Sequence, residues 1–200
     1  MLMRSVTLTA CTLALVCSAK ADPPQNYYAA AADKTGAELK STLHDIIDDH
    51  RVVRYSSKIP DTADFAKRCI LGRRMLERGV RFVQIWSGAG GPTNNWDNHA
   101  NIHKELPHMT RQADKPIAGL LKDLNARGML EDTLVVWTTE FGRMPFSQGQ
   151  AGRDHNGGTF VTWLAGGGAK GGTVVGRTDD YGYNVVEDSV HVHDFHATLL

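Results

Sequence analysis

The stretch from Leu134 to Gly172 constrains the fold more than any other part of the sequence. It contains two apolar runs, residues 134–139 and 159–165, separated by a polar, glycine-rich loop. Short apolar runs bounded by glycines predict two buried strands joined by that loop. Ligand sites in open α/β sheets gather at the carboxyl ends of parallel strands. The pattern therefore places Glu140, Asp154 and His155 at such an edge.

The segments before this stretch alternate between helical and strand patterns. Apolar residues at helical spacing predict a helix over residues 61–79, which ends at Gly79. Residues 80–86 predict a strand, and residues 109–127 predict a second helix with its apolar face turned inward. The chain then enters the strand at Leu134. Strands that alternate with helices favour an α/β fold with a mainly parallel sheet.

The first 21 residues have the pattern of a secretory signal peptide. Arg4 provides a positive charge, residues 6–16 form a short apolar core, and Ala19-Lys20-Ala21 fits a cleavage site. The apolar core is too short to span a bilayer. We therefore expect an exported protein, periplasmic or extracellular. Of the three cysteines only Cys69 would remain after cleavage, so no intrachain disulfide is expected, and its apolar helical setting predicts a core residue.

Residues 22–57 form a separate segment in which Thr35 to Asp49 predicts one amphipathic helix, capped by Thr35 and Glu38. The segment resembles the N-terminal part of secreted endonuclease I-type nucleases. The matching residues are Tyr27-Tyr28, Lys34-Thr35-Gly36, Leu39-Lys40, Leu43-His44 and Ile46-Ile47. The catalytic core of those nucleases does not follow downstream, so a secreted nuclease is the weakest of the functional hypotheses.

The zero net charge argues against nucleic acid and anionic membranes as partners, and the histidine content suggests a metal site. Formal net charge is zero, which gives no long-range attraction to nucleic acid or to an anionic membrane, so neither is expected to bind. Six of the nine histidines lie in two groups, residues 99–108 and 191–196. This clustering justifies a search for metal ligands.

Several carboxylate and imidazole side chains occupy loops after the predicted strands or the start of the last helix. Carboxylate and imidazole together suit zinc, manganese or iron. Arg143 could hold an anionic group, or it could pair with a neighbouring carboxylate. Taken singly, each residue is better explained as an ordinary solvated side chain, and only the group as a whole favours a polar site. The candidate ligands are Asp97, His99, Glu140, Asp154, His155, His191 and His193.

From about residue 58 to the end, the chain resembles the C-terminal part of the DUF-1501 family, bacterial exported proteins related to sulfatases and alkaline phosphatases. The matching motifs are Arg78-Gly79-Val80-Arg81-Phe82-Val83-Gln84, Trp96-Asp97-Asn98-His99, Leu134 to Arg143, Gly152-Arg153-Asp154-His155, Trp163 to Gly168 and His191-Val192-His193-Asp194. The resemblance implies a partial alkaline-phosphatase-like α/β/α sandwich. It also implies one or more divalent metals, with zinc, manganese or calcium as candidates.

The sequence departs from that superfamily at two places. The strand over residues 134–139 is followed by Glu140-Phe141 where the superfamily has an Asp-His pair, and phenylalanine cannot bind a metal. The first strand of the fold and its nucleophile should precede residue 61, where the nuclease-like segment stands instead. We therefore expect a truncated domain over residues 58–200, with the nucleophile unidentified and Arg143 as the residue that binds the substrate oxyanion.

Two functional hypotheses follow from these features. The first is metal-dependent hydrolysis of small sulfate or phosphate esters. The second is a truncated or degenerate relative without catalysis, which acts as a structural or binding protein. An incomplete sheet leaves an unpaired edge, so such a protein is expected to self-associate through it.

Overall fold

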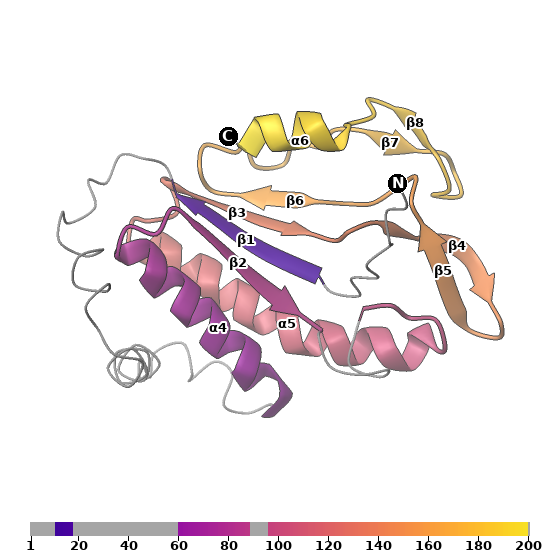
Figure 1. The fold of residues 1–200 in the computed structure, drawn as a ribbon, viewed down its shortest axis with the longest axis horizontal. Coiled ribbons are helices and arrows are strands. Elements are labelled where there is room, and N and C mark those ends of the chain that lie inside the picture. Colours follow the sequence, from indigo (N-terminus) through magenta and orange to yellow (C-terminus); the bar gives the residue numbers. More distant parts are fainter. Residues whose placement is uncertain (1–10, 18–59, 89–95, 200) are drawn as a thin grey trace, which may run out of the picture.

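A four-stranded sheet forms the centre of the molecule in the computed structural model, which describes residues 11–17, 60–88 and 96–199 (Figure 1). The strands lie in the order β2-β1-β3-β6. Each adjacent pair is antiparallel, so β2 and β3 run in the same direction with β1 between them in the opposite direction. The bounds are Cys11–Cys17 for β1, Phe82–Ser87 for β2, Thr133–Thr138 for β3 and Trp163–Ala165 for β6.

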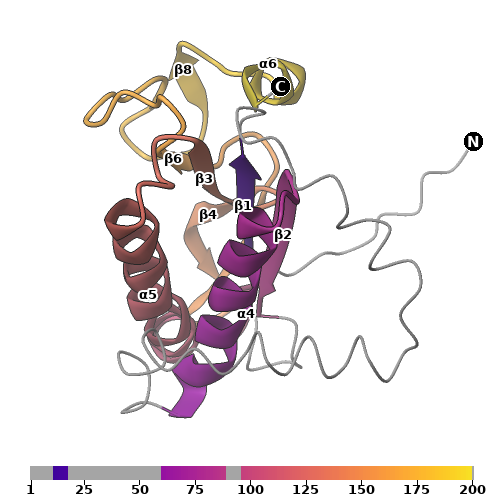
Figure 2. The same ribbon diagram turned by 90° about the vertical axis from the view of Figure 1, so that its left-hand side faces the viewer.

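Two helices, α4 (Pro60–Glu77) and α5 (Ile102–Ala126), lie side by side against one face of this sheet (Figures 1 and 2). Leu13 of β1 pairs with Ile85 and Trp137, and Leu15 pairs with Val83 and Val135. Side chains on opposed residues of neighbouring strands share a face, so these pairs form continuous apolar rows. The rows pack against residues of both helices, namely Phe65, Cys69, Leu76, Ala113, Leu120 and Leu124.

The helices expected from periodicity over residues 61–79 and 109–127 form as α4 and α5. Cys69 is fully buried and unbonded, as its apolar setting predicted, and burial raises the pKa of its thiol to about 12. Helix α5 begins earlier than expected because Asn101 caps it: its side-chain oxygen accepts from the backbone N–H groups of His103 and Lys104. Pro107 and Pro116 both lie inside α5, and the helix expected from Met109 left the first of them outside.

Buried charges tie the two helices together. Arg73 of α4 is 2% exposed, and its guanidinium lies 2.7 Å from Glu77 on the same helix and 2.9 Å from Asp123 on α5. Arg127 bonds the same two carboxylates from the end of α5. Two positive and two negative side chains therefore pair with one another where α4 and α5 meet. These ion pairs hold the two helices in one register.

The expectation of a mainly parallel, alkaline-phosphatase-like sandwich is wrong. The sheets are mostly antiparallel, for two physical reasons. Residues 11–17, which overlap the predicted apolar core of a leader (residues 6–16), form a central strand antiparallel to both neighbours. A parallel pair needs a long crossover, usually a helix. Residues 139–162 instead contain a hairpin, so β6 returns antiparallel to β3, and the run expected as a strand over 159–165 forms only the short β6.

The helical layers also differ from those of a sandwich. Helices α4 and α5 cover the same face, and β2 turns alternate residues such as Phe82 and Trp86 outward on the other. The remaining elements are the hairpin β4–β5 (Gly142–Gln148 and Gly152–Asn156), the pair β7–β8 (Arg177–Thr178 and Val185–Glu187) and α6 (Val192–Leu199). Among the described residues, no helix combines the length and apolar character needed to cross a membrane.

Some predictions concern residues outside the described part of the chain. These are the helix over 35–49, the nuclease-like segment 22–57, and the ends of the predicted leader on either side of β1. The helix expected to begin at His193-Asp194 forms as α6, which starts at Val192.

Candidate metal centre

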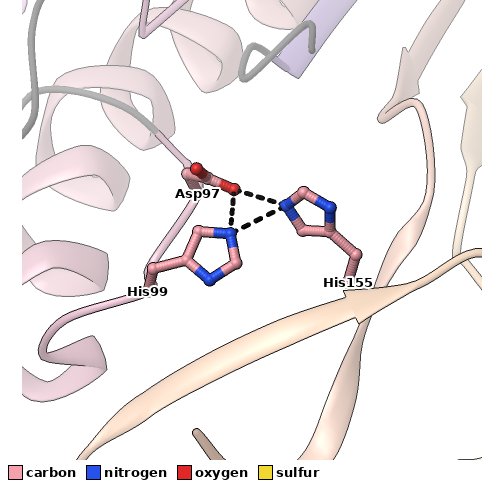
Figure 3. Close-up of side chains that lie close together, drawn as sticks. All are labelled: Asp97, His99 and His155. Atoms are coloured by element: carbon pink, nitrogen blue, oxygen red, sulfur yellow. Dashed lines mark hydrogen bonds and ion pairs between the residues drawn. The ribbon is translucent and has the colours of Figure 1, made fainter. Parts of the chain in front are cut away.

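Three side chains from distant parts of the chain converge on one point: Asp97, His99 and His155 (Figure 3). Asp97 Oδ1 lies 2.9 Å from His155 Nε2 and 3.0 Å from His99 Nε2, and the two ring nitrogens are 2.8 Å apart. The three atoms thus form a nearly equilateral triangle. Two imidazoles and a carboxylate that face one another in this way are the donor set of a transition-metal site.

Asp97 and His99 come from the segment between β2 and α5. Asn98 between them has φ +53°, in the left-handed region that asparagine tolerates, and its side chain donates to the carbonyl of Trp96 at 2.8 Å. Trp96 is itself anchored by a bond from its indole nitrogen to Ser87 Oγ at the end of β2. This local turn aims both ligands at the same point.

His155 reaches the cluster from the β4–β5 hairpin. In that hairpin Arg143 pairs directly with His155, so both side chains lie on one face. Asp154, the next residue along β5, belongs to the opposite face by strand alternation, is exposed, and accepts a bond from the backbone N–H of His155. Asp154 is therefore next to the cluster in sequence but is not part of it.

Backbone contacts clamp the hairpin onto the segment of Asp97 and His99. The N–H of Arg153 donates to the carbonyl of Asn98 at 2.9 Å, and that of Ile102 donates to the carbonyl of Ala151 at 3.0 Å. Gly152 lies between these contacts, where an added Cβ would stand 1.8 Å from the carbonyl oxygen of His99. Only glycine permits this approach, which brings residues 97 and 155 together.

Arg143 supplies positive charge at the edge of the cluster. Its guanidinium lies 2.8 Å from Asp97 Oδ1 and 3.9 Å from Glu140 Oε1, and it stacks over the ring of Phe141. Burial alone would raise the pKa of Asp97, but the hydrogen bond with His155 and the charge of Arg143 hold that pKa below its ordinary value. Asp97 therefore stays ionised and available as a ligand.

Glu140 lies beside the cluster but is not one of its three converging side chains. Partial burial raises its pKa above the ordinary value, although a backbone hydrogen bond and the charge of Arg143 act in the opposite direction. Its side chain contacts Arg143 and is not among the atoms that converge with Asp97. Glu140 therefore orients the guanidinium in this structure.

Of the seven predicted ligands, the structure brings together Asp97, His99 and His155. His191 and His193 pair with each other at the start of α6, with ring centroids 5.0 Å apart, and lie outside the cluster. Two contacts were not foreseen: Gln148 Oε1 lies 2.5 Å from His99 Nδ1, and the Phe141 ring packs on His155. Nothing in the sequence distinguishes Gln148 from other loop glutamines, because its role depends on the β4–β5 register.

The contact with Gln148 sets the protonation pattern of the cluster. An amide oxygen only accepts hydrogen bonds, so His99 Nδ1 carries a proton in this contact, and in the neutral form of the ring Nε2 then presents a lone pair toward Asp97 and His155. Partners of this kind on the second ring nitrogen are typical of metal-bound histidines. The residues present therefore fit a divalent metal.

A family model described as "Protein of unknown function (DUF1501)" matches residues 19–200. The chain belongs to the DUF1501 family. No curated protein and no solved structure matches the chain. The part of this DUF1501 chain that the family model covers includes all three ligands, Arg143 and Gln148, whereas β1 precedes it.

Proposed function

We propose that this DUF1501 protein is an exported, metal-dependent hydrolase that acts on small sulfate or phosphate esters. The observation that carries the proposal is the convergence of Asp97, His99 and His155 beside a guanidinium. A divalent ion bound there would act as a Lewis acid on an ester oxygen. Export rests on the leader-like pattern of the first 21 residues.

The roles of the protein groups follow from their positions. Asp97, His99 and His155 would hold the ion, with Gln148 keeping the His99 lone pair turned inward. Arg143 carries several N–H groups in a planar fork, which suits the oxygens of a sulfate or phosphate group. It is 19% exposed and lies against Asp97, so it can reach an anion at the cluster from a partly desolvated position.

The open side of the site is compatible with a small substrate. The side chains of His99 and His155 are 36% and 31% exposed, so the cluster lies at the surface of the molecule and not in its core. No nucleophilic side chain is assigned to the reaction. Asp97 Oδ1 and the two imidazole nitrogens contact one another, and the guanidinium of Arg143 contacts Asp97 Oδ1.

The test is hydrolysis of p-nitrophenyl phosphate and p-nitrophenyl sulfate by the full chain loaded with manganese or zinc. We expect p-nitrophenol release that a chelator abolishes. Arg143→Ala should lower the rate by about 100-fold, because it removes a donor to the developing negative charge.

His103→Ala is the matched control for His99→Ala. His103 is exposed and lies outside the cluster, so its removal should leave the rate unchanged, whereas removal of His99 should lower it at least about tenfold. A metal-loaded, folded chain that releases p-nitrophenol from neither ester would contradict the proposal.

A further inference from the structure

An open pocket of about 510 Å³ lies between the β4–β5 hairpin and the loop that joins β7 to β8 (Figure 1). The residues that line it are Pro145, Phe146, Asp179, Tyr181, Tyr183 and Asn184. Asn156 of β5 donates to the carbonyl of Tyr183 at 3.0 Å and so holds the loop against the hairpin. Asn156 follows His155, so by strand alternation its side chain lies on the other face of β5. The pocket is therefore separate from the metal cluster, and its volume is within the range of small-molecule sites, about 300–1,000 Å³.

The carboxylate of Asp179 organises the loop on one side of the pocket. It accepts hydrogen bonds from the backbone N–H groups of Tyr181, Tyr183 and Asn184, at 3.2, 2.8 and 2.9 Å, and from the Asn184 amide at 3.2 Å. These bonds, of which that from Tyr183 has the largest effect, hold the pKa of Asp179 below its ordinary value. The backbone that carries the two tyrosines is therefore ordered before a ligand binds, which reduces the entropic cost of binding.

Three of the lining side chains are aromatic and are open to solvent. Phe146, Tyr181 and Tyr183 are 59%, 80% and 40% exposed, and the rings of Phe146 and Tyr183 stack with their centroids 5.9 Å apart. Exposed apolar groups that gather in one place mark a binding surface, whereas scattered ones need no explanation. The face of an aromatic ring is negative, so it attracts the positively polarised C–H groups of another ring. The pocket therefore suits a ligand that contains a ring with an apolar face.

The charge and the exposure of the lining residues select the class of ligand. Among them only Asp179 is charged at neutral pH, and its oxygens already accept the bonds of the loop, so the pocket repels anions and offers little to a cation. Rings that remain exposed leave part of a bound ligand in water, which favours a ligand with polar edges over a wholly apolar one. A sugar ring has an apolar C–H face, hydroxyl groups at its edge and no charge. We propose that this pocket binds a sugar ring of a neutral oligosaccharide, independently of the hydrolase activity.

Calorimetric titration of the full chain with neutral oligosaccharides tests the sugar site. The probes are cellohexaose, laminarihexaose, xylohexaose and mannohexaose, which differ in linkage and in the arrangement of their hydroxyl groups. We expect saturable binding of at least one of them. Tyr181→Ala and Phe146→Ala should each lower the affinity at least about tenfold, because each removes a stacking ring, whereas Tyr181→Phe keeps the ring and should stay within about threefold. Phe82→Ala is the matched control and should leave the affinity unchanged, since Phe82 is 55% exposed but does not line the pocket.

The absence of saturable binding for all four probes would overturn the sugar site, and so would equal affinities of the parent chain, Tyr181→Ala and Phe146→Ala. Sedimentation velocity gives a second readout, because exposed rings can also pack against a second copy of the chain. A dimer that Tyr181→Ala converts to a monomer, and that the oligosaccharides do not dissociate, would assign the rings to self-association and overturn the sugar site. His99→Ala should retain sugar binding whatever its effect on ester hydrolysis, so this inference and the proposed function fail separately.

Discussion

A single carboxylate oxygen organises the site at the scale of residues. Asp97 Oδ1 contacts His99, His155 and Arg143, at distances of 3.0, 2.9 and 2.8 Å. Without an ion, this oxygen accepts from Arg143 and His155, whereas the Nε2 lone pair of a neutral His99 faces the same oxygen with no proton between them. A divalent ion would accept the lone pairs of Asp97 Oδ1 and His99 Nε2 together, and this is the physical argument for the proposed metal site.

Asp97 and Asp154 were both predicted as ligands, and only Asp97 lies in the cluster, which allows a direct test. Asp97→Asn should lower the affinity for manganese or cobalt at least about tenfold, because it replaces a charged ligand. Asp154→Asn should leave the affinity within about twofold, because Asp154 lies on the other face of β5. Isothermal titration calorimetry on the two variants measures this difference, and equal losses would place Asp154 back among the ligands.

The sequence predicted the right kinds of side chain and only some of the right ones. Asp97-Asn98-His99 was identifiable because a carboxylate and an imidazole follow a strand and a loop. Asp154 and His155 were equivalent in the sequence, and the strand that separates their faces had been expected as a loop. Gln148 could not be found, because its contact with His99 depends on a hairpin with an irregular register between Arg143 and Ser147.

At the scale of elements, the site depends on how closely β5 approaches the segment before α5. The hairpin carries His155 and Arg143, and the loop carries Asp97 and His99, so their separation sets the ligand triangle. Gly152 at the crossing leaves no space for a side chain. The glycines of this region had been interpreted as part of a polar, glycine-rich loop, whereas Gly152 lies in β5 where two backbones are in contact.

Gly152→Ala is therefore expected to damage the metal site without removing a ligand. The new methyl group would meet the carbonyl of His99, so the hairpin must shift and the triangle must widen. We expect at least about tenfold weaker cobalt binding and a lower melting temperature. Gly157→Ala is the matched control, since nothing lies within 4 Å of its added Cβ. Equal cobalt affinity for both variants would show that the close approach is not needed.

At the scale of the whole molecule, the sheet depends on its central strand. Leu13 and Leu15 of β1 are both 0% exposed, and β1 supplies the pairing partner for β2 on one side and β3 on the other. The helix–strand alternation of residues 61–139 was predictable because the apolar periodicity of a helix or strand does not depend on how the strands are ordered in the sheet. The antiparallel order was not, because the apolar run at residues 11–17 is equally typical of a secretory leader and of a buried strand.

In the fold, residues 11–17 form the central strand, whereas a secretory leader would be removed by cleavage. A stability measurement tests whether these residues belong to the folded protein. Leu15→Ala should lower the free energy of unfolding by about 2–5 kcal/mol, the usual cost of truncating a buried leucine. Leu106→Ala, on the exposed side of α5, should change it by less than about 1 kcal/mol.

A chain that comprises residues 22–200 loses both buried leucines and the pairing of two strands. These losses approach the total stability of an ordinary domain, about 5–15 kcal/mol, so we expect no cooperative unfolding transition in urea for this shortened chain. The full chain should show one. If residues 22–200 unfold with the same midpoint and slope as the full chain, β1 is not part of the stable folded unit. In that case β2 and β3 must pair with each other or with another segment, because buried N–H and C=O groups do not remain unpaired.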